Sequence, residues 1–412
     1  MSLSVTNTIE DVTEEIIDYR GKTPAKTPNG IKLVTAKVIK DGRILDGPHE
    51  FIAEEAYDSW MRRGLPRQWD VLVTTEAPLG EVAILRTTEK VALAQRVILL
   101  RGKPAMIDQR YYYQALKSPF VQGELSARSS GTTVLGIKQS ELRQVRIPYF
   151  PLKVQRKIAR VLSAYDDLIE NNTRRIRILE EMAQAIYREW FVHFRFPGHK
   201  KVKLVPSPLG PIPEGWAPNR LGELAEEIRR SVQPAEVGPE TPYVGLEHIP
   251  RKSIALSDWG TASQVQSTKL AFKQGEILFG KIRPYFHKVV VAPLDGVCSS
   301  DAIVILPKKS DSFGLVLACV SSEAFVSHAT QTSQGTKMPR ANWDVLVKYP
   351  TPTPPRSLLL QFNEQILQIV DLIQNLVFQV RNLRRTRDLL LPKLISGELD
   401  VSDLDINVEE AT

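Results

Sequence analysis

The chain has few of the residue patterns on which metal binding, redox chemistry or membrane insertion depend. It contains only two cysteines, Cys298 and Cys319, and six scattered histidines, none of which pairs with another His or Cys at metal-ligand spacing. No run of about 18 apolar residues is present, and the N-terminus lacks the apolar core of a signal peptide. We therefore expect no metal, no cofactor, no membrane contact and a reducing, cytoplasmic location.

The standard catalytic motifs are missing as well. The segment from Gly275 to Lys281 has the spacing of a phosphate-binding loop, but Ile282 stands where Ser or Thr should hold Mg²⁺. No Gly-x-Gly-x-x-Gly follows a predicted strand, and no Gly-x-Ser-x-Gly occurs. The tetrapeptides Asn-Pro-Pro-Tyr and Asp-Pro-Pro-Tyr, which flank the target base in amino-methyltransferases, are also absent. We therefore expect no catalytic residues.

The chain does have an excess of positive charge and the length of more than one domain. Its 54 Lys and Arg residues exceed 47 Asp and Glu residues, which gives a net charge of +7. This balance favours a polyanionic partner, although charge alone is weak evidence for one. A chain of 412 residues is too long for a single ordinary core, so we expect two or three domains.

An internal repeat organises the sequence. A shift of 204 residues superposes Ser129–Thr132 on Ser333–Thr336 and, without a gap, Asp167–Ile169 on Asp371–Ile373. Further identities fall in the same order across a Pro-rich stretch and a helical stretch. This self-similarity predicts two copies of one structural unit.

Each copy ends in a long predicted helix whose apolar residues are spaced 4-3-4-3, as in the seam of a coiled coil. The first seam contains Ile158, Leu162, Tyr165, Ile169, Asn172, Ile176 and Leu179, and the second contains Phe362, Ile366, Ile369, Ile373, Leu376, Val380 and Leu383. Arg387 departs from the pattern, and Pro392 is expected to end or kink the second helix. Helices of about thirty residues would be about 45 Å long. We expect the two stripes to cover each other, although each could instead pack on its own domain.

The stretches before the two helices contain short β-branched and aliphatic runs bounded by turns, which predict strand-rich mixed domains. We therefore predict an α+β protein with two such domains separated by two long antiparallel coiled-coil helices. The predicted segments are a first domain at 1–150, a first helix at 151–195, a Pro/Gly-rich linker at 196–215, a second domain at 216–354, a second helix at 355–399 and an acidic tail at 400–412.

Basic and aromatic residues on the predicted strand-turn segments are candidates for contacts with DNA, because Arg and Lys bind phosphates and read guanine. In the first domain they are Lys22, Lys26, Arg62, Arg63 and Arg67. In the second domain they are Lys281, Arg283, Tyr285, His287, Lys337 and Arg340. Any single one of them could equally be a solvated surface residue.

The layout and several local phrases resemble the specificity subunits of Type I restriction–modification enzymes. The phrases are Pro151-Leu152 followed by Gln155 and Ile158, then Leu209–Trp216, Tyr243–Ile249 and Leu391–Leu399. One departure is Pro355–Leu358, which lacks the Pro-Leu-x-x-Gln form of the first copy and leaves the start of the second helix open.

The resemblance implies a DNA-binding subunit without an active site. In this family each target-recognition domain reads one half of a split, asymmetric DNA sequence, and the paired helices act as a ruler for the gap. The implied partners are double-stranded DNA, DNA adenine methyltransferase subunits, usually two, and a restriction motor-nuclease subunit when restriction is possible. Two alternatives stay open: a stand-alone DNA-modifying enzyme with an unrecognised site, and a coiled-coil adaptor that binds only protein.

Overall fold

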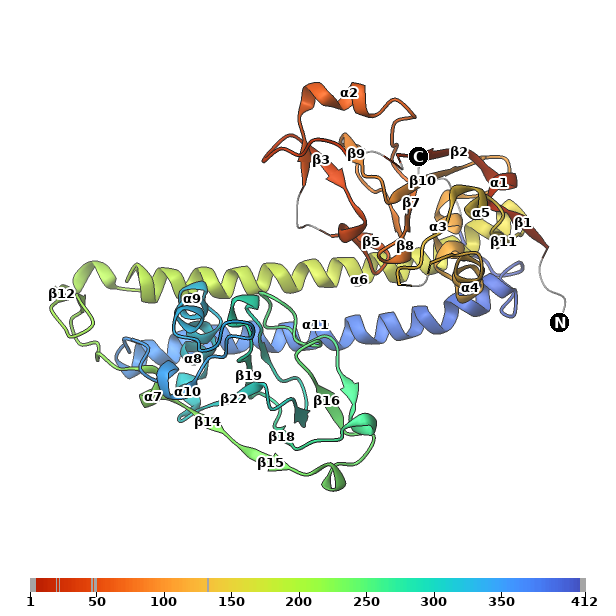
Figure 1. The fold of residues 1–412 in the computed structure, drawn as a ribbon. Helices are drawn as coiled ribbons and strands as arrows, with labels where there is room; N and C mark the ends of the chain where they lie inside the picture. The colour runs from red at the N-terminus through yellow and green to blue at the C-terminus, as the bar shows by residue number, and fades with distance from the viewer. Residues whose placement is uncertain are drawn as a thin grey trace. The chain divides into compact units, whose positions relative to one another are not determined.

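A computed structural model describes residues 5–407 of the chain except Arg20, Lys22, Asp46, Pro48, His49 and Thr132. The chain forms two compact units, seen along the ribbon of Figure 1. Unit 1 comprises Met1–Asp167 and Arg384–Thr412, and unit 2 comprises Leu168–Leu383. Each unit therefore combines parts of several predicted segments, and the segment boundaries given above stay predictions.

Unit 1 is built on an antiparallel sheet with the strand order β2-β10-β7-β8. Its strands are Thr13–Asp18 (β2), Val97–Gly102 (β10), Val71–Thr75 (β7) and Leu79–Ile84 (β8). The other strands are Thr6–Thr8 (β1), Ile31–Val34 (β3), Ile39–Lys40 (β4), Arg43–Ile44 (β5), Phe51–Ile52 (β6), Val91–Leu93 (β9) and Arg146–Pro148 (β11). The helices that precede the long helix are Ile9–Val12 (α1), Tyr57–Trp60 (α2), Gln109–Lys117 (α3), Pro119–Ala127 (α4) and Gln139–Arg143 (α5).

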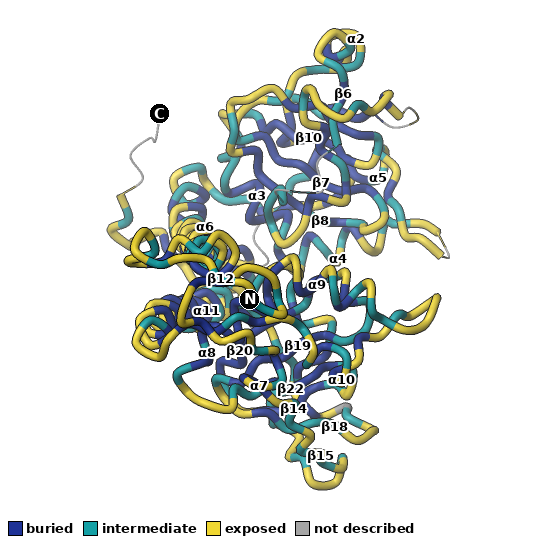
Figure 2. Tube along the Cα trace, turned by 90° about the vertical axis from the view of Figure 1, so that its left-hand side faces the viewer, coloured by how far each residue is buried: buried dark blue, intermediate teal, exposed yellow. Residues whose placement is uncertain are grey.

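The central strands of unit 1 are apolar on both faces because both faces are covered. Val71 and Val73 of β7 pack in one core with Tyr111 of α3, whereas Leu72 packs in a second core with Leu33 of β3. Successive residues of a strand point to opposite faces, so a continuous apolar run is what a doubly covered strand requires. Figure 2 shows β7 and β10 in the dark blue of buried residues.

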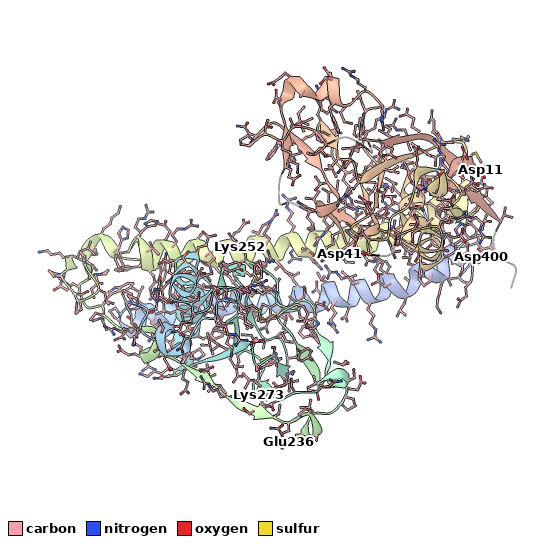
Figure 3. All side chains as sticks on the ribbon, viewed as in Figure 1. Asp11, Asp41, Glu236, Lys252, Lys273 and Asp400 are labelled. Carbon is pink, nitrogen blue, oxygen red and sulfur yellow. The ribbon has the colours of Figure 1, made fainter. Side chains whose placement is uncertain are left out.

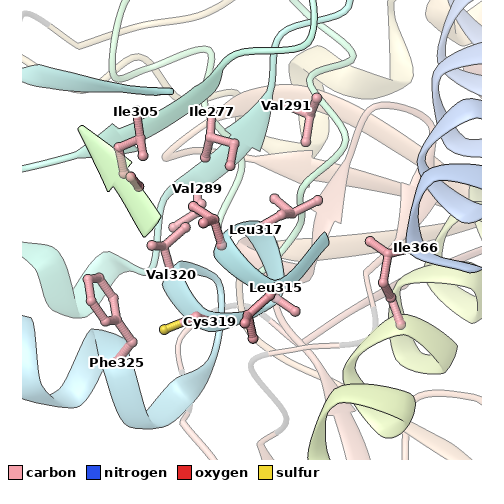
Figure 4. Close-up of a cluster of buried hydrophobic side chains, with 14 of the residues drawn as sticks. Ile277, Val289, Val291, Ile305, Leu315, Leu317, Cys319, Val320, Phe325 and Ile366 are labelled. Atoms are coloured by element: carbon pink, nitrogen blue, oxygen red, sulfur yellow. The ribbon is translucent and has the colours of Figure 1, made fainter. Parts of the chain in front are cut away.

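Unit 2 repeats this plan with the strand order β14-β22-β19-β20. The strands are Ala225–Ile228 (β14), Ala302–Pro307 (β22), Ile277–Gly280 (β19) and Val289–Val291 (β20). A five-stranded sheet adds Arg230–Val232 (β15), Lys269–Phe272 (β18), Gly296–Cys298 (β21), Pro242–Val244 (β16) and Gly260–Thr261 (β17), and a separate pair is Leu204–Val205 (β12) with Ile212–Pro213 (β13). The short helices are Leu221–Leu224 (α7), Phe313–Val320 (α8), Glu323–Gln331 (α9) and Trp343–Leu346 (α10). Figure 4 shows strand residues such as Ile277 and Ile305 beside Leu317 of α8 and Phe325 of α9.

The helices follow the predicted repeat without a gap. Helices α3, α4, α5 and α6 begin at Gln109, Pro119, Gln139 and Leu152, and α8, α9, α10 and α11 begin 204 residues later, at Phe313, Glu323, Trp343 and Arg356. Together with the shared strand order, this confirms the predicted α+β fold with an internal repeat.

The two long helices are α6 (Leu152–Tyr187), which ends in a π-helical turn at Arg188–Val192, and α11 (Arg356–Ser396). They are antiparallel. In unit 1, Asp166 of α6 binds Arg387 of α11. In unit 2, Asn172 binds Gln379 and the ring of Trp190 meets that of Phe362, so positions rise along one helix as they fall along the other.

Most of the predicted seam positions are buried. Within their own units the buried positions are Ile158, Leu162, Ile169, Asn172, Ile176, Phe362, Ile366, Ile369, Ile373, Leu376 and Val380, and the half-buried ones are Tyr165, Leu179 and Leu383. Pro392 was expected to end or kink the second helix, and α11 continues through it, so the helix does not end there. The missing N–H of Pro392 frees only the carbonyl of the exposed Asp388, and Leu391 and Leu394 hold this turn in the core of unit 1.

Candidate nucleic-acid interface

Two loops of unit 2, residues 281–288 and 334–340, are joined into one surface that we call the unit 2 loop pair. The backbone of Ile282 bridges that of Arg340, the N–H of Ala341 donates to the carbonyl of Lys281 at 2.9 Å, and the N–H of Arg283 donates to that of Pro339 at 2.7 Å. Four predicted contact residues, Lys281, Arg283, Lys337 and Arg340, therefore lie on segments that are paired in space although they are distant in sequence.

The side chains of the unit 2 loop pair differ in exposure: Arg283 is half-buried, whereas Lys337 and Arg340 are exposed. Arg283 adopts a left-handed backbone conformation with φ of 49° just before Pro284. Its Nη2 lies 3.4 Å from the carbonyl oxygen of Lys337, and its Nε is buried with no hydrogen-bond partner among the described residues. Lys337 and Arg340 are exposed, and the nearest carboxylate oxygen of Asp301 is 3.7 Å from Arg340.

Aromatic rings and a further arginine flank this surface. The ring of Tyr285 is 51% exposed and meets the ring of Phe286 edge-on. The guanidinium of Arg251 lies 3.9 Å from the centroid of Phe286. Sequence reasoning missed Arg251 because the residue lies outside any predicted strand-turn pattern, two residues after the Tyr243–Ile249 phrase. Its neighbour Lys252, labelled in Figure 3, is neutralised by Glu323 at 2.8 Å.

His287 occupies a different place from the one expected. It is only 8% exposed, and its Nε2 lies 2.8 Å from the backbone carbonyl oxygen of Ser321. Burial lowers the pKa of His287 below its ordinary value, which keeps the ring neutral at neutral pH. Because its ring is buried and already bonded within the fold, we leave His287 out of the contact surface.

The corresponding loops of unit 1, residues 76–78 and residues 130–136 apart from Thr132, form the unit 1 loop pair. The N–H of Ile137 donates to the carbonyl of Thr75 at 3.0 Å, and Ala77 has φ of 48° before Pro78, as Arg283 does before Pro284. The side chains differ: Glu76 pairs with Arg96 at 2.7 Å, and the exposed tip carries Val134 and Leu135. The two units thus share a loop geometry and present different chemistry on it.

The basic residues predicted for the first domain lie on other segments. Lys26, before β3, pairs with Glu50 at 2.7 Å, and this contact holds the pKa of Glu50 below its ordinary value. Arg63, after α2, donates to the carbonyl of Asp18 and lies over the ring of Tyr19. Arg62 and Arg67 on the same segment are exposed, whereas Lys22 lies outside the described residues.

The buried ion pairs of the two units serve the fold. Asp70 precedes β7 and binds the Arg101 guanidinium at 2.7 Å while accepting the N–H of Arg67. Glu276 precedes β19 and binds Arg230 at 2.7 Å while accepting the N–H of Lys273. Each carboxylate thus holds the turn that leads into a central strand, and its negative charge is paired with an arginine of the same unit.

Comparison with known proteins shows which proteins the chain resembles. Residues 8–181 match the family model of the Type I restriction modification DNA specificity domain. The chain is 28% identical over 362 residues to the Type I restriction enzyme MjaIX specificity subunit of Methanocaldococcus jannaschii, a match that covers 86% of this chain and 82% of that one. It is 25% identical over 405 residues to the EcoDI specificity subunit of Escherichia coli, covering 90% and 86%. Residues 8–181 thus match the DNA specificity domain, and the chain over most of its length is similar to Type I specificity subunits.

The fold of the chain is similar to that of a solved structure. The crystal structure of a Type I S subunit from M. genitalium matches it with a TM-score of 0.57 at 15% identity, over 95% of this chain and 96% of that one. The similarity to Type I specificity subunits supports, in general terms, DNA sequence recognition within a restriction–modification assembly.

The described residues contain no metal-binding cluster, and both cysteines are buried. Among the described residues, no group of three or more His, Cys, Asp or Glu side chains could hold a metal ion. Burial raises the pKa of Cys298 to about 12 and that of Cys319 to about 11, so both thiols stay protonated at neutral pH. No single helix in the described ranges is long and apolar enough to cross a membrane, and only the bent pair Ser310–Val320 and Glu323–Gln331 passes that test jointly.

Proposed function

We propose that this specificity subunit reads a bipartite, asymmetric DNA sequence, with one recognition domain on each half. Helices α6 and α11 set the length of the unread gap between the halves. The subunit contributes no catalytic group of its own. Two DNA adenine methyltransferase subunits, and a motor-nuclease subunit where restriction occurs, take their position on DNA from it.

The observation that carries this proposal is a duplicated scaffold with unlike loops. Both units have the same order of four central strands and the same pairing of two loops. The unit 2 loop pair presents cationic and aromatic groups, whereas the unit 1 loop pair presents Val134, Leu135 and the Glu76–Arg96 pair. A common scaffold that carries different side chains suits two domains that recognise different DNA sequences. The loop side chains determine which bases are recognised, and the scaffold holds the loops in place.

The chemistry of each loop pair favours a kind of contact. Arg283 and Arg340 have the planar guanidinium that bonds the O6 and N7 atoms of guanine in the major groove, and Lys281 and Lys337 suit phosphates. Val134 and Leu135 offer apolar surface of the kind that contacts the methyl group of thymine. These assignments extend the residues predicted from sequence and stay part of the proposal.

The long helices support the gap-setting role by their length and their fixed register. Helix α6 has 36 residues and α11 has 41, which correspond to about 54 Å and about 62 Å. Two polar contacts interrupt the apolar seam: Asn172 with Gln379 at 3.2 Å in unit 2, and Asp166 with Arg387 at 2.8 Å in unit 1. A polar pair in a coiled-coil seam penalises a slip of one helix along the other, because a slip leaves buried polar groups unpaired.

Selection from a random duplex pool by the purified full-length chain tests the proposal. We expect two short enriched blocks at one fixed separation, and affinity that falls steeply with salt because phosphate contacts release counterions. The same chain incubated with S-adenosylmethionine and the selected DNA should transfer no methyl group. One continuous enriched block, no enrichment, or methyl transfer by the chain alone would each contradict the proposal.

A further inference from the structure

A buried carboxamide on α6 holds the start of the first core helix of unit 1. Gln155 has no exposed surface. Its Oε1 accepts the N–H of Asp108 at 2.9 Å, and its Nε2 donates to the carbonyls of Met106 at 3.0 Å and Phe150 at 2.7 Å. Asp108 is the N-cap of α3, so Gln155 supplies bonds to backbone groups that precede the helix and have no partner within it.

A second buried carboxamide, on α11, does the same for unit 2. Asn363 is 6% exposed. Its Oδ1 accepts the N–H of Gly314 at 2.7 Å, and its Nδ2 donates to the carbonyl of Ser310 at 3.2 Å. Gly314 lies in the first turn of α8, the repeat equivalent of α3, where backbone N–H groups need an acceptor from outside the helix.

The two carboxamides explain the departure between the two copies of the sequence. The residue 204 positions after Gln155 is Leu359, which cannot form these bonds. Asn363 lies one helical turn later on the same face of α11 and reaches the equivalent junction with its shorter side chain. The sequence loses the motif at the expected position, but the structure keeps the contact.

The opposite ends of α3 and α8 are also fastened to the long helices. In unit 1, Gln114 near the end of α3 donates to Asp166 of α6 at 2.6 Å, and the Lys117 ammonium lies 3.5 Å from the same carboxylate. In unit 2, Nε2 of Gln184 on α6 donates to the hydroxyl of Ser321, the C-cap of α8, at 2.9 Å. Two attachment points on one short helix fix its direction as well as its position, so neither core helix can pivot freely on its long helix.

We propose that Gln155 and Asn363 are positioning residues that hold each recognition domain in one orientation on its long helix. This inference rests on the proposed bipartite reading. If neither domain can tilt, the length of the helices allows binding only to sites with one gap length. If one domain is released at one end, the chain also binds sites whose gap is slightly shorter or longer. Replacing either carboxamide by leucine leaves buried backbone groups without partners, which weakens the attachment but not the loops that read bases.

The test measures binding of the full-length chain to duplexes with the selected half-sites at the native gap and at gaps one base pair shorter or longer. We expect the wild type to prefer the native gap by at least about tenfold, the scale of one mismatched base pair. In Gln155→Leu, Asn363→Leu and the double variant this preference should fall to about threefold or less. Base changes within either half-site should still weaken binding as in the wild type. Gln365→Leu, an exposed change two residues from Asn363, should keep the wild-type preference.

Amide hydrogen exchange provides a second readout that does not depend on DNA. Protection should fall at residues 108–111 in Gln155→Leu and at 313–316 in Asn363→Leu, with the rest of each unit unchanged. If Gln155→Leu does not fold, Gln155→Asn shortens the carboxamide while keeping its polarity. Folded variants that keep the full gap preference would overturn this inference alone. A wild type without any gap preference would overturn the bipartite reading itself.

Discussion

Arg283 combines the features expected of a residue that reads a base. It stands on the paired loops of unit 2, its backbone is held in the left-handed region at φ of 49°, and its half-buried side chain lies beside the exposed Lys337. We predict that Arg283→Ala lowers DNA affinity by about tenfold and relaxes discrimination at one half-site, since a lost bidentate contact costs about 1–3 kcal/mol. Binding to duplexes with single base changes measures both effects.

Arg229→Ala is the matched control, because this exposed arginine lies in unit 2 between β14 and β15, away from the loop pair, and pairs with Glu227. It should leave discrimination at both half-sites intact. Equal loss of discrimination at the two half-sites in Arg283→Ala would argue against independent reading by two domains.

Lys117 gives unit 1 a defined dependence on pH. Burial lowers the pKa of Lys117 to about 8, because desolvation and the charge of Arg387 outweigh the attraction of Asp166. The unfolded chain, with an ordinary pKa of 10.5, binds more protons than the folded one between these values. The contribution of Lys117 to stability therefore rises with pH in this window and is lost as pH falls through about 8.

We predict that Lys117→Met removes this rise. Urea unfolding at pH 7.5 and at pH 9.5 should show the variant losing stability relative to the wild type as the pH increases. Other titrating groups are common to both proteins and cancel in the difference. A difference in unfolding free energy that is the same at both pH values would contradict the assigned cause.

At this scale the sequence indicated residue types better than their surroundings. Lys281, Arg283, Lys337 and Arg340 were predicted as contacts because basic residues flank strand-turn segments in the second copy, and the structure shows that they lie on paired loops. Arg387 looked like a defect in the seam, and only the contact with Asp166 at 2.8 Å shows its partner. The periodicity of a sequence shows which residues share a helix face but not which side chain lies opposite. The burial and the partners of single residues could therefore not be predicted from it.

The long helices are the elements that the gap-setting proposal depends on. Their matched seam allows a clean deletion: residues 168–174 of α6 and 378–384 of α11 each form one heptad, and together they remove both members of the Asn172–Gln379 contact. We predict that the double deletion shortens the permitted gap by at most about three base pairs, since seven helical residues span about 10.5 Å. Binding to a panel of gap lengths measures the shift.

Deletion from one helix alone serves as the control for this prediction. It places apolar seam residues opposite the wrong partners and should reduce stability rather than move the preferred gap. A double deletion that binds with the native gap length would refute the role of the helices in spacing.

The elements were predictable to different degrees. The helices keep the 204-residue offset because the repeat has no insertions there, but β2 and β14 begin at Thr13 and Ala225, an offset of 212. Insertions in the strand-rich halves change the length of connections without disturbing the sheet order, because surface loops tolerate added residues. The sequence therefore indicated strands in general but not their pairing.

For the whole molecule, the antiparallel helices bring distant parts of the chain into one unit. The segment predicted as an acidic tail begins within unit 1: Val401 is 2% exposed in its core, and the ammonium of Lys157 donates to the carbonyls of Ser402 and Leu404. Dividing the sequence into consecutive segments cannot predict that residues 401–404 pack in unit 1, because this packing depends on contacts between residues more than 240 positions apart.

The most direct test of the central claim, that two domains of one chain read the two halves of one DNA site, is a map of methylated adenines in DNA modified by the complex that contains this chain. We predict one methylated adenine in each of two short, unlike blocks, separated by a gap of constant length. In the Arg283→Ala complex, only one block should become degenerate. Methylation within a single continuous motif, or at sites with no constant gap, would contradict the account.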